Sequence, residues 1–393
     1  MNVPKLRFKE FSDEYKKYTF AELADYKKGP FGSALKKEIF VPKSENSVKV
    51  YEQQNAIKKD WTLERYFITK EYYKKLKGFT IGPGDIIVSC AGTIGEYYVL
   101  PNEAEMGVIN QALMRIITNK KINQNYFLYI FDNMVYNFSK TFSNGSAIKN
   151  IPPFADLKKQ IAYIPTIEEQ NKVSIALKLL DKKIELQSKK IEDLKLFKKG
   201  FIEFEFSNSN YNEINLKEIL KERKSYSEKG LEFPHVTLSK DGIYDKTDRY
   251  NRDFLVKSDD KKYKITYLND LCYNPANLKF GVICLNEYGS AIFSPIYVTF
   301  VIKNIANPKY IKYYVTRNNF INAIRKYEQG TVYERMAVAP EDFLKFSIKL
   351  PNIEIQNKFV DKLSKLDQKI ELENLKLSRY IKLKKGLMQN MFV

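Results

Sequence analysis

The chain has 393 residues, 44% of them hydrophobic and 14% aromatic, which is enough for two or three packed domains. Its net charge of +19 favours a polyanionic partner such as nucleic acid over a general lysine bias. A single histidine, His235, and three scattered cysteines argue against histidine-based catalysis, zinc sites and a disulfide framework. We find no signal segment and no run of 18 apolar residues, so we expect a cytoplasmic protein.

The residue pattern of 1–163 predicts a block that is rich in strands. Residues 84–89 predict a strand, a glycine turn follows, and an apolar run predicts a second strand. Residues 110–117 predict a further strand, and residues 123–140 predict an aromatic helix. A glycine-containing loop, residues 144–149, completes the block.

Residues 164–207 predict a long helix. Pro165 stands just upstream, acidic residues occupy the first turn, and lysines followed by Gly200 predict the end. The apolar residues step by four and three, which indicates a heptad seam with polar Gln187 at one position. The seam residues are Val173, Leu177, Leu180, Ile184, Ile191 and Leu194.

Residues 208–349 predict a second block with the same order of elements. Strands are expected around residues 269–275 and 280–283 and in the apolar run to Val301, and residues 310–327 look helical. A glycine loop, residues 329–335, follows. Outside these points the two blocks barely match.

Residues 350–393 repeat the first long helix. At a constant offset, which aligns Ile164 with Leu350, the two segments share 18 identities in 43 positions without a gap. Glu373 takes the place of Gln187, and Gly386 that of Gly200. About 30 helical residues would span about 45 Å. The second seam consists of Phe359, Leu363, Leu366, Ile370, Leu377 and Tyr380.

The unequal divergence of helices and blocks indicates a division of labour. Helices that pair with each other must stay alike, whereas blocks that read different ligands are free to differ. With the basic charge, this pattern favours two readers of a bipartite DNA site. Antiparallel pairing would relate the repeats by a pseudo-twofold axis, which matches the symmetry of a duplex backbone.

Several segments resemble the specificity subunits of type I restriction–modification systems. They are the start, residues 3–8 with Phe11 and Tyr15, the segments GDIIVS and GTIG, the loop NGSAIKNI, the stretch YNPANLKFG and both IP-x-I-E-x-Q-N-K-like helix starts. The resemblance covers essentially the whole chain. It implies an α+β fold, with two mixed α/β target-recognition domains, residues 1–163 and 208–349, separated by two long antiparallel helices, residues 164–207 and 350–393.

The resemblance also implies what the chain binds. The expected partners are bipartite double-stranded DNA, two methyltransferase (modification) subunits and two restriction subunits, without a membrane. Methyl donor and ATP would be used by those partners, so no cofactor is expected here. The chain would be a non-catalytic part of a DNA adenine methyltransferase and ATP-dependent restriction endonuclease.

Candidate DNA contacts are lysines and arginines for phosphates, and polar or amide side chains for base edges. In the first block they are Lys36, Lys37, Gln53, Gln54, Asn55, Lys58, Lys59, Asn144, Ser146 and Lys149. In the second they are Arg223, Lys224, Tyr226, Thr237, Lys240, Asn274, Asn277, Lys279, Tyr333 and Arg335. Gln170 and Asn171, repeated in the second helix, are interpreted as capping or partner contacts.

Other functions fit the sequence less well. Asn274-Pro275-Ala276-Asn277 has part of the NPPY motif of adenine methyltransferases but lacks its second proline and its aromatic residue. Neither a nucleotide-binding glycine loop nor a clustered acidic nuclease site stands out, so a stand-alone methyltransferase or nuclease is disfavoured. A coiled-coil adaptor, or a DNA-binding protein outside restriction–modification, stays open as an alternative. Apolar residues off the seam predict a protein partner: Ile175, Leu179, Leu186, Leu372, Leu375 and Leu383.

Overall fold

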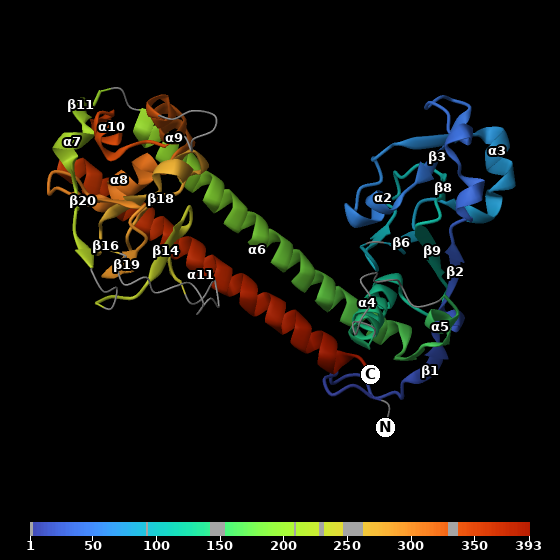
Figure 1. The fold of residues 1–393 in the computed structure, drawn as a ribbon. Coiled ribbons are helices and arrows are strands. Elements are labelled where there is room, and N and C mark those ends of the chain that lie inside the picture. Colours follow the sequence, from blue (N-terminus) through green and yellow to red (C-terminus); the bar gives the residue numbers. More distant parts are fainter. Residues whose placement is uncertain are drawn as a thin grey trace. The chain divides into compact units, whose positions relative to one another are not determined.

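The computed structural model describes residues 3–91, 93–141, 154–207, 210–227, 232–246, 262–328 and 337–393. The chain forms two compact units (Figure 1). Unit 1 is Met1–Gln187 with Lys376–Val393, and unit 2 is Ser188–Leu375. Each long helix therefore contributes one half to each unit.

Unit 1 is built on two four-stranded sheets. One is antiparallel, in the order β2-β9-β6-β7, and the other, β4-β3-β8-β5, contains the parallel pair β3/β8. A small ribbon of β1 and β10 joins the beginning and the end of the block. The strands are β1 (Lys16–Thr19), β2 (Ala24–Lys28), β3 (Ser47–Tyr51), β4 (Tyr66–Thr69), β5 (Thr80–Ile81), β6 (Ile86–Ser89), β7 (Tyr97–Val99), β8 (Gly107–Ile109), β9 (Leu113–Thr118) and β10 (Ile161–Ile164). The helices of the block are α1 (Phe20–Leu23), α2 (Gln53–Ile57), α3 (Lys70–Lys75), α4 (Gln124–Thr141) and α5 (Phe154–Lys159), with 3-10 turns at Gly32–Ala34, Lys37–Ile39 and Lys77–Phe79.

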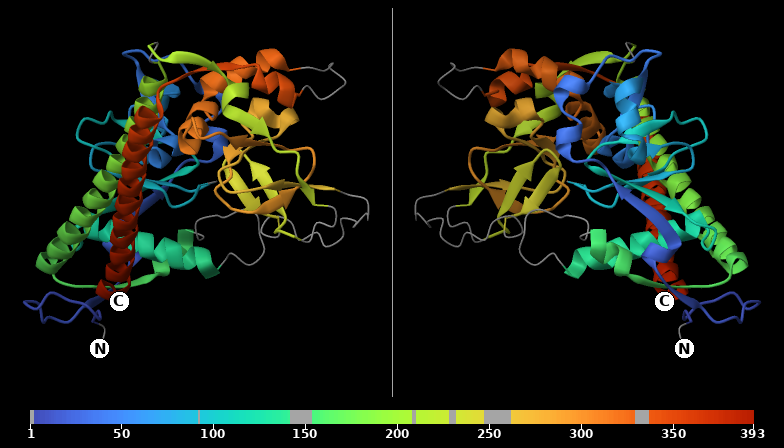
Figure 2. Two further views of the ribbon diagram at one scale, coloured as in Figure 1. Left: turned by 90° about the vertical axis from the view of Figure 1, so that its left-hand side faces the viewer. Right: turned by 90° about the vertical axis from the view of Figure 1, so that its right-hand side faces the viewer.

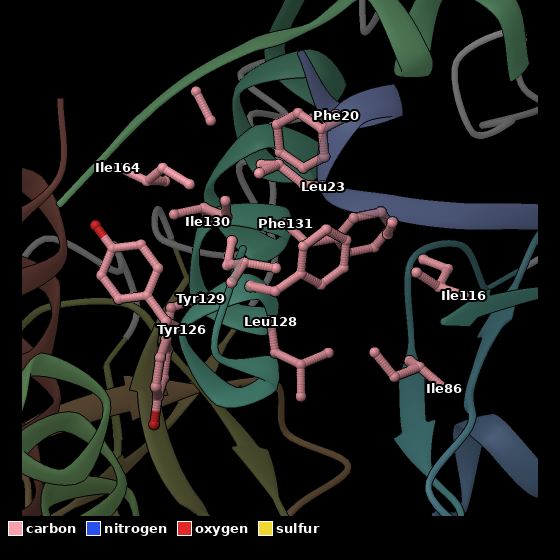
Figure 3. Close-up of a cluster of buried hydrophobic side chains, with 14 of the residues drawn as sticks. Phe20, Leu23, Ile86, Ile116, Tyr126, Leu128, Tyr129, Ile130, Phe131 and Ile164 are labelled. Carbon is pink, nitrogen blue, oxygen red and sulfur yellow. The ribbon is translucent and has the colours of Figure 1, made fainter. Parts of the chain in front are cut away.

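The main core of unit 1 lies between α4 and the antiparallel sheet. Residues 126–131 of α4 belong to one buried cluster with Ile86 and Ile116 of the sheet and Phe20 of α1, and in Figure 3 Leu128 and Phe131 lie on the side of α4 that faces the sheet. Val173 and Leu177 of the first long helix and Met391 and Phe392 of the second belong to the same cluster. The apolar face of α4 therefore ties the sheet to both long helices.

Unit 2 contains the same antiparallel sheet in the order β12-β20-β17-β18. A three-stranded sheet β13-β16-β19, the hairpin β14-β15 and the ribbon β11-β21 complete it. The strands are β11 (Asn212–Asn215), β12 (Leu220–Glu222), β13 (Tyr226–Ser227), β14 (Val236–Ser239), β15 (Gly242–Asp245), β16 (Tyr263–Thr266), β17 (Leu271–Tyr273), β18 (Ile283–Leu285), β19 (Ala291–Phe293), β20 (Val298–Ile302) and β21 (Ser347–Leu350). The helices of this block are α7 (Leu216–Ile219), α8 (Pro308–Val315), α9 (Asn318–Ile324) and α10 (Pro340–Leu344), with 3-10 turns η4 (Pro275–Phe280) and Arg325–Tyr327.

The prediction of one helix over residues 310–327 is wrong, because two helices, α8 and α9, occupy this stretch. The amides of Thr316 and Arg317 close α8, and α9 starts at Asn318 with Arg317 in an extended conformation.

The strand predicted at residues 280–283 is wrong in its position, because η4 runs to Phe280 and the strand β18 begins only at Ile283. The other predicted strands are confirmed within four residues at their ends, and α4 confirms the predicted aromatic helix.

Both long helices run further than their glycines suggest. α6 spans Ile167–Ser207 and α11 spans Ile353–Met391, so Gly200 and Gly386 lie inside helices and do not end them. A helical glycine costs only about 1 kcal/mol. Residues beyond each glycine are packed: Phe201 and Phe206 contact the core around Phe359, and Met391 is buried in unit 1. Packing outweighs this local cost.

The halves of α6 and α11 pair antiparallel within each unit (Figure 2). Asp181 binds Lys384 in unit 1, and in unit 2 Lys190 binds Glu373 and Lys198 binds Asp367. Residue numbers rise along one helix as they fall along the other, which confirms the predicted antiparallel pair. None of the twelve predicted seam residues is exposed. No helix in the described part of the chain is both long enough and apolar enough to cross a membrane.

Candidate nucleic-acid interface and block junctions

In unit 1 the basic candidates lie on short helical turns and are open to solvent. Lys36 and Lys37 are exposed at the 3-10 turn Lys37–Ile39, and Gln54, Lys58 and Lys59 are exposed on and after α2. Lys59 has a left-handed backbone, with φ of 52°, which turns the chain sharply after the helix. Apart from Lys59, whose ammonium lies 5.9 Å from the centroid of the Tyr97 ring, these side chains can reach a phosphate or a base edge.

Asn55 does not have this freedom, and the structure corrects its interpretation as a base reader. It is 2% exposed, its Oδ1 accepts the Glu52 amide at 2.8 Å, and its Nδ2 donates to the carbonyls of Asp60 and Leu63 at 3.0 Å each. Asn55 thus fixes the loop after α2. The neighbouring Gln53 has a buried Oε1 with no hydrogen-bond partner among the described residues.

In unit 2 Lys224, Tyr226, Lys240 and Asn277 are exposed, while Thr237 and Lys279 are half-buried. Arg223 is occupied instead. Its Nε and Nη2 donate to both oxygens of buried Asp270 at 2.7 and 2.9 Å, and this hydrogen bonding raises the pKa of Arg223. We therefore correct Arg223 from a DNA contact to an internal ion pair.

Asn274 is a second correction. It is 7% exposed, and its Oδ1 accepts the amides of Ala276 and Asn277 at 3.1 and 3.3 Å as the N-cap of η4. The segment that resembles a methyltransferase motif is thus a helix cap with its amide oxygen engaged. Among the described residues, no group of acidic, cysteine and histidine side chains is placed to hold a metal ion.

Five candidates fall outside the described residues: Asn144, Ser146, Lys149, Tyr333 and Arg335. They belong to the two glycine loops.

Sequence reasoning missed a pair of amide contacts, which we call the amide junctions. In unit 1 Gln170 Oε1 accepts the Asn123 amide at 2.8 Å, and Asn171 Oδ1 accepts Asn123 Nδ2 at 2.8 Å. In unit 2 Gln356 and Asn357 make the same bonds to Asn307, at 2.7 and 2.8 Å. Asn123 precedes α4 and Asn307 caps α8. Gln170 and Asn171 therefore bind their own block, which corrects their interpretation as capping or partner contacts.

A second repeated contact joins each block to both long helices. In unit 1 Asp181 Oδ2 accepts from the Tyr129 hydroxyl at 2.8 Å, and its Oδ1 pairs with Lys384 at 2.6 Å. In unit 2 Asp367 Oδ2 accepts from Tyr313 at 3.3 Å, and its Oδ1 pairs with Lys198 at 2.5 Å. Burial and the carboxylate of Asp367 raise the pKa of Tyr313 to about 12. We call these two sets the junction triads.

The long helices also leave apolar side chains in solvent. Ile175, Leu179 and Leu186 are 56–67% exposed on α6, and Leu372, Leu375 and Leu383 are 52–59% exposed on α11. Spacings of four and seven residues place the first three on one helix face. The predicted exposure of these residues is confirmed. Exposed apolar stripes of this kind mark protein interfaces.

Comparisons with known proteins agree with this architecture. Residues 12–196 match the family model described as "Type I restriction modification DNA specificity domain". The S subunit of a type I restriction–modification system from M. genitalium has a similar fold, with a TM-score of 0.51 and 16% identity over 100% of this chain and 99% of that one. The HsdS subunit from Thermoanaerobacter tengcongensis matches with a TM-score of 0.51 and 12% identity over 97% of both chains. No curated protein matches the chain.

A third solved chain comes from a study titled "Structural basis underlying complex assembly andconformational transition of the type I R-M system", with a TM-score of 0.59 and 11% identity over 96% of this chain and 97% of that one. The repeated sheets and the paired helices show an internally duplicated fold, and residues 12–196 of it match a DNA specificity domain. Residues 12–196, a little under half of the chain, are similar to the DNA-specificity domain of type I restriction–modification systems, and the whole chain shares the fold of solved S subunits.

Proposed function

We propose that the chain reads a DNA site split into two halves, one half for each block. The first reader is residues 1–163 and the second is residues 208–349, with residues 164–207 and 350–393 as the helices that hold them. One observation carries this proposal: the same antiparallel sheet is attached to the helix pair by the same amide junctions and junction triads in both units. Two DNA-reading blocks that are attached to one helix pair by equivalent contacts can each bind one half of a bipartite duplex site.

The candidates that are exposed or half-buried form the proposed DNA contacts. Lysines supply phosphate contacts, and Gln54, Tyr226 and Asn277 supply polar groups for base edges. The contacts retained from the described residues are Lys36, Lys37, Gln53, Gln54, Lys58, Lys59, Lys224, Tyr226, Thr237, Lys240, Asn277 and Lys279. We also propose DNA contacts from the two glycine loops, by Asn144, Ser146, Lys149, Tyr333 and Arg335.

We further propose two methyltransferase subunits and, for cleavage, two restriction subunits as partners. The exposed leucines at equivalent positions of the two helices, Leu186 and Leu372, give each methyltransferase copy a similar apolar surface. Methyl donor and ATP would serve the adenine methyltransferase and the restriction endonuclease of the complex. This chain would contribute no catalytic group and would act in the cytoplasm with the rest of the system.

Methylation mapping tests the reading function. Cells that carry this chain with its modification subunit should show adenine methylation at one split sequence. The purified complex should lose affinity for that duplex steeply as salt rises, because phosphate contacts release counterions. Methylation of a single unsplit sequence would overturn the two-reader proposal. Assembly with protein partners but no salt-dependent DNA binding would support the adaptor alternative.

Single leucine variants test the partner proposal. Leu186→Asp and Leu372→Asp should each remove one methyltransferase copy from the complex, because a carboxylate cannot be buried unpaired in an apolar contact. The mass of the purified complex measures this loss. Glu192→Ala, at an exposed position of α6 on another face, is the matched control. If both leucine variants still form complexes with two methyltransferase subunits, these subunits do not bind at Leu186 and Leu372.

A further inference from the structure

The two junction triads attach each block to both long helices through one carboxylate. Tyr129 belongs to α4, and Asp181 and Lys384 belong to α6 and α11. Since the two oxygens of Asp181 serve different elements, moving either element breaks one of its contacts. Asp367 has the same arrangement with Tyr313 of α8 and Lys198 of α6.

Each triad works with an amide junction at a second point of the same block helix. Asn123, which precedes α4, and Tyr129 of α4 are six residues apart, as are Asn307, the N-cap of α8, and Tyr313 of α8. Apolar packing around these helices is non-directional and would tolerate small rotations. Hydrogen bonds are directional, so two of them at separate points fix both the angle and the position of the helix.

The block helices carry the sheets that hold the proposed readers. Leu128 and Phe131 of α4 pack in one core with Ile86 and Ile116 of its sheet (Figure 3). In unit 2, Ile311 and Val315 of α8 pack with strand residues of the equivalent sheet. A change in the angle of α4 or α8 therefore moves its reader as a body.

We propose that Asp181 and Asp367 are positioning residues that set the angle of each reader on the helix pair. They thereby fix how many base pairs the complex accepts between the two half-sites, without contacting DNA. This inference rests on the proposed reading of a split site. It assigns base preference and spacing to different residues, the first to the readers and the second partly to the triads.

Methylation mapping of variants in the full complex tests the assignment. Asp181→Ala and Asp367→Ala should each keep the bases of both half-sites. Methylation at sites with one base pair more or fewer between the halves should rise about tenfold over the parent, because each alanine variant removes both the tyrosine contact and the lysine contact of its triad. Glu192→Ala on α6 and Glu371→Ala on α11, both at exposed positions, should keep the spacing of the parent.

The outcomes separate a positioning role from simple stabilisation. A variant that lowers methylation at the parent spacing and adds no other spacing overturns the inference. If the alanine variants abolish methylation, Tyr129→Phe and Tyr313→Phe replace them, since each removes a single hydroxyl. Methylation at additional spacings in these variants supports the inference, and reduced methylation at the parent spacing alone overturns it. A parent that methylates no split site contradicts the proposed function itself, which is a different result.

Discussion

The two units differ least where the blocks meet the long helices and most in the sheets beyond the one that both units share. The amide junctions measure 2.8 and 2.8 Å in unit 1 and 2.7 and 2.8 Å in unit 2, and both junction triads use the same residue types. Beyond the common sheet, unit 1 adds a four-stranded sheet with a parallel pair, whereas unit 2 adds a three-stranded sheet and a hairpin. The attachment is thus repeated and the proposed reading layer is not.

A second difference lies at the helix ends. Tyr310 packs on Phe206, and its hydroxyl bonds Glu205 at 3.3 Å. The equivalent Tyr126 packs on Phe392, but Met391 stands where Glu205 would be, and the Tyr126 hydroxyl has no hydrogen-bond partner among the described residues. Unit 1 therefore keeps the aromatic contact, between Tyr126 and Phe392, but lacks the hydrogen bond that Tyr310 donates to Glu205 in unit 2.

The largest expected effect comes from exchanging one block. Replacing residues 1–163 by the corresponding block of a related specificity subunit should replace one half-site completely and leave the other unchanged, because the helix junctions are repeated while the readers differ. Methylation mapping of the chimera beside the parent checks this. A chimera in which both half-sites change would show that the two readers are not independent.

A matched insertion in both helices should lengthen the spacer while keeping the bases read. The repeat alone suggests Ile184 and Ile370 as equivalent insertion points. An insertion after Ile184 falls between the pairs Asp181–Lys384 and Lys190–Glu373, whereas one after Ile370 falls between Lys190–Glu373 and Lys198–Asp367. Together they would shift Lys190 away from Glu373 and break that ion pair. Four residues after Gln187 and four after Leu375 fall between the pairs Asp181–Lys384 and Lys190–Glu373 on both helices. One added turn of about 6 Å should add one or two base pairs. An unchanged spacer in an active variant would show that helix length does not set it.

Much of the fold was predictable because it is periodic or repeated. Heptad steps and the constant offset between the two copies predicted both helices, and alternating apolar runs predicted the strands near residues 86, 113 and 271. The ends of the helices were not predictable from Gly200 and Gly386, because packing by Phe206 and Met391 outweighs a local preference. The break after Val315 depends on capping geometry that the apolar pattern does not record.

The site was less predictable than the fold. Amide side chains suit base edges and structural caps equally, so the sequence could not separate exposed Gln54 from buried Asn55. The junctions did carry a signal, since the Gln-Asn-Lys triplet and the aspartate recur at the same offset. Their partners, Asn123 and Tyr129, recur at a slightly shorter offset, and this match appears only once the blocks are superposed by their sheets.

Among point variants, Glu169→Ala should destabilise unit 1 the most. Glu169 is 1% exposed and accepts both a bidentate ion pair from Arg7, at 2.7 and 2.8 Å, and the Tyr15 hydroxyl at 2.9 Å. Removing it leaves a guanidinium without its partner and should cost about 3 kcal/mol. The equivalent residue of unit 2, half-exposed Ile355, should cost at most about 0.5 kcal/mol when changed to alanine. Urea unfolding measures both, and equal losses would contradict the asymmetry.

Asp132 should make the stability of unit 1 depend on pH, whereas its equivalent in unit 2, Thr316, cannot titrate. Burial raises the pKa of Asp132 to about 6. The folded state then holds a proton that the unfolded chain has released, so this stability is present at low pH and is lost as pH rises through 6. Asp132→Asn should therefore stabilise the protein by on the order of 3 kcal/mol at pH 8 and by much less near pH 4, where the unfolded chain also holds the proton. Exposed Asp241→Asn is the control, and a gain independent of pH would contradict the assignment.

The smallest effects should come from the two equivalent tyrosines, and they should have opposite signs. Tyr310→Phe removes the hydroxyl that bonds Glu205 and should cost about 1 kcal/mol. Tyr126→Phe removes a buried hydroxyl without a partner in the described structure and should stabilise unit 1 by up to about 1 kcal/mol. Met391→Gln would supply unit 1 with the polar group that it lacks, so in that background Tyr126→Phe should lose its benefit. A double-mutant cycle of unfolding free energies measures this coupling, and effects of one sign for both tyrosines would show that the missing glutamate is not the cause.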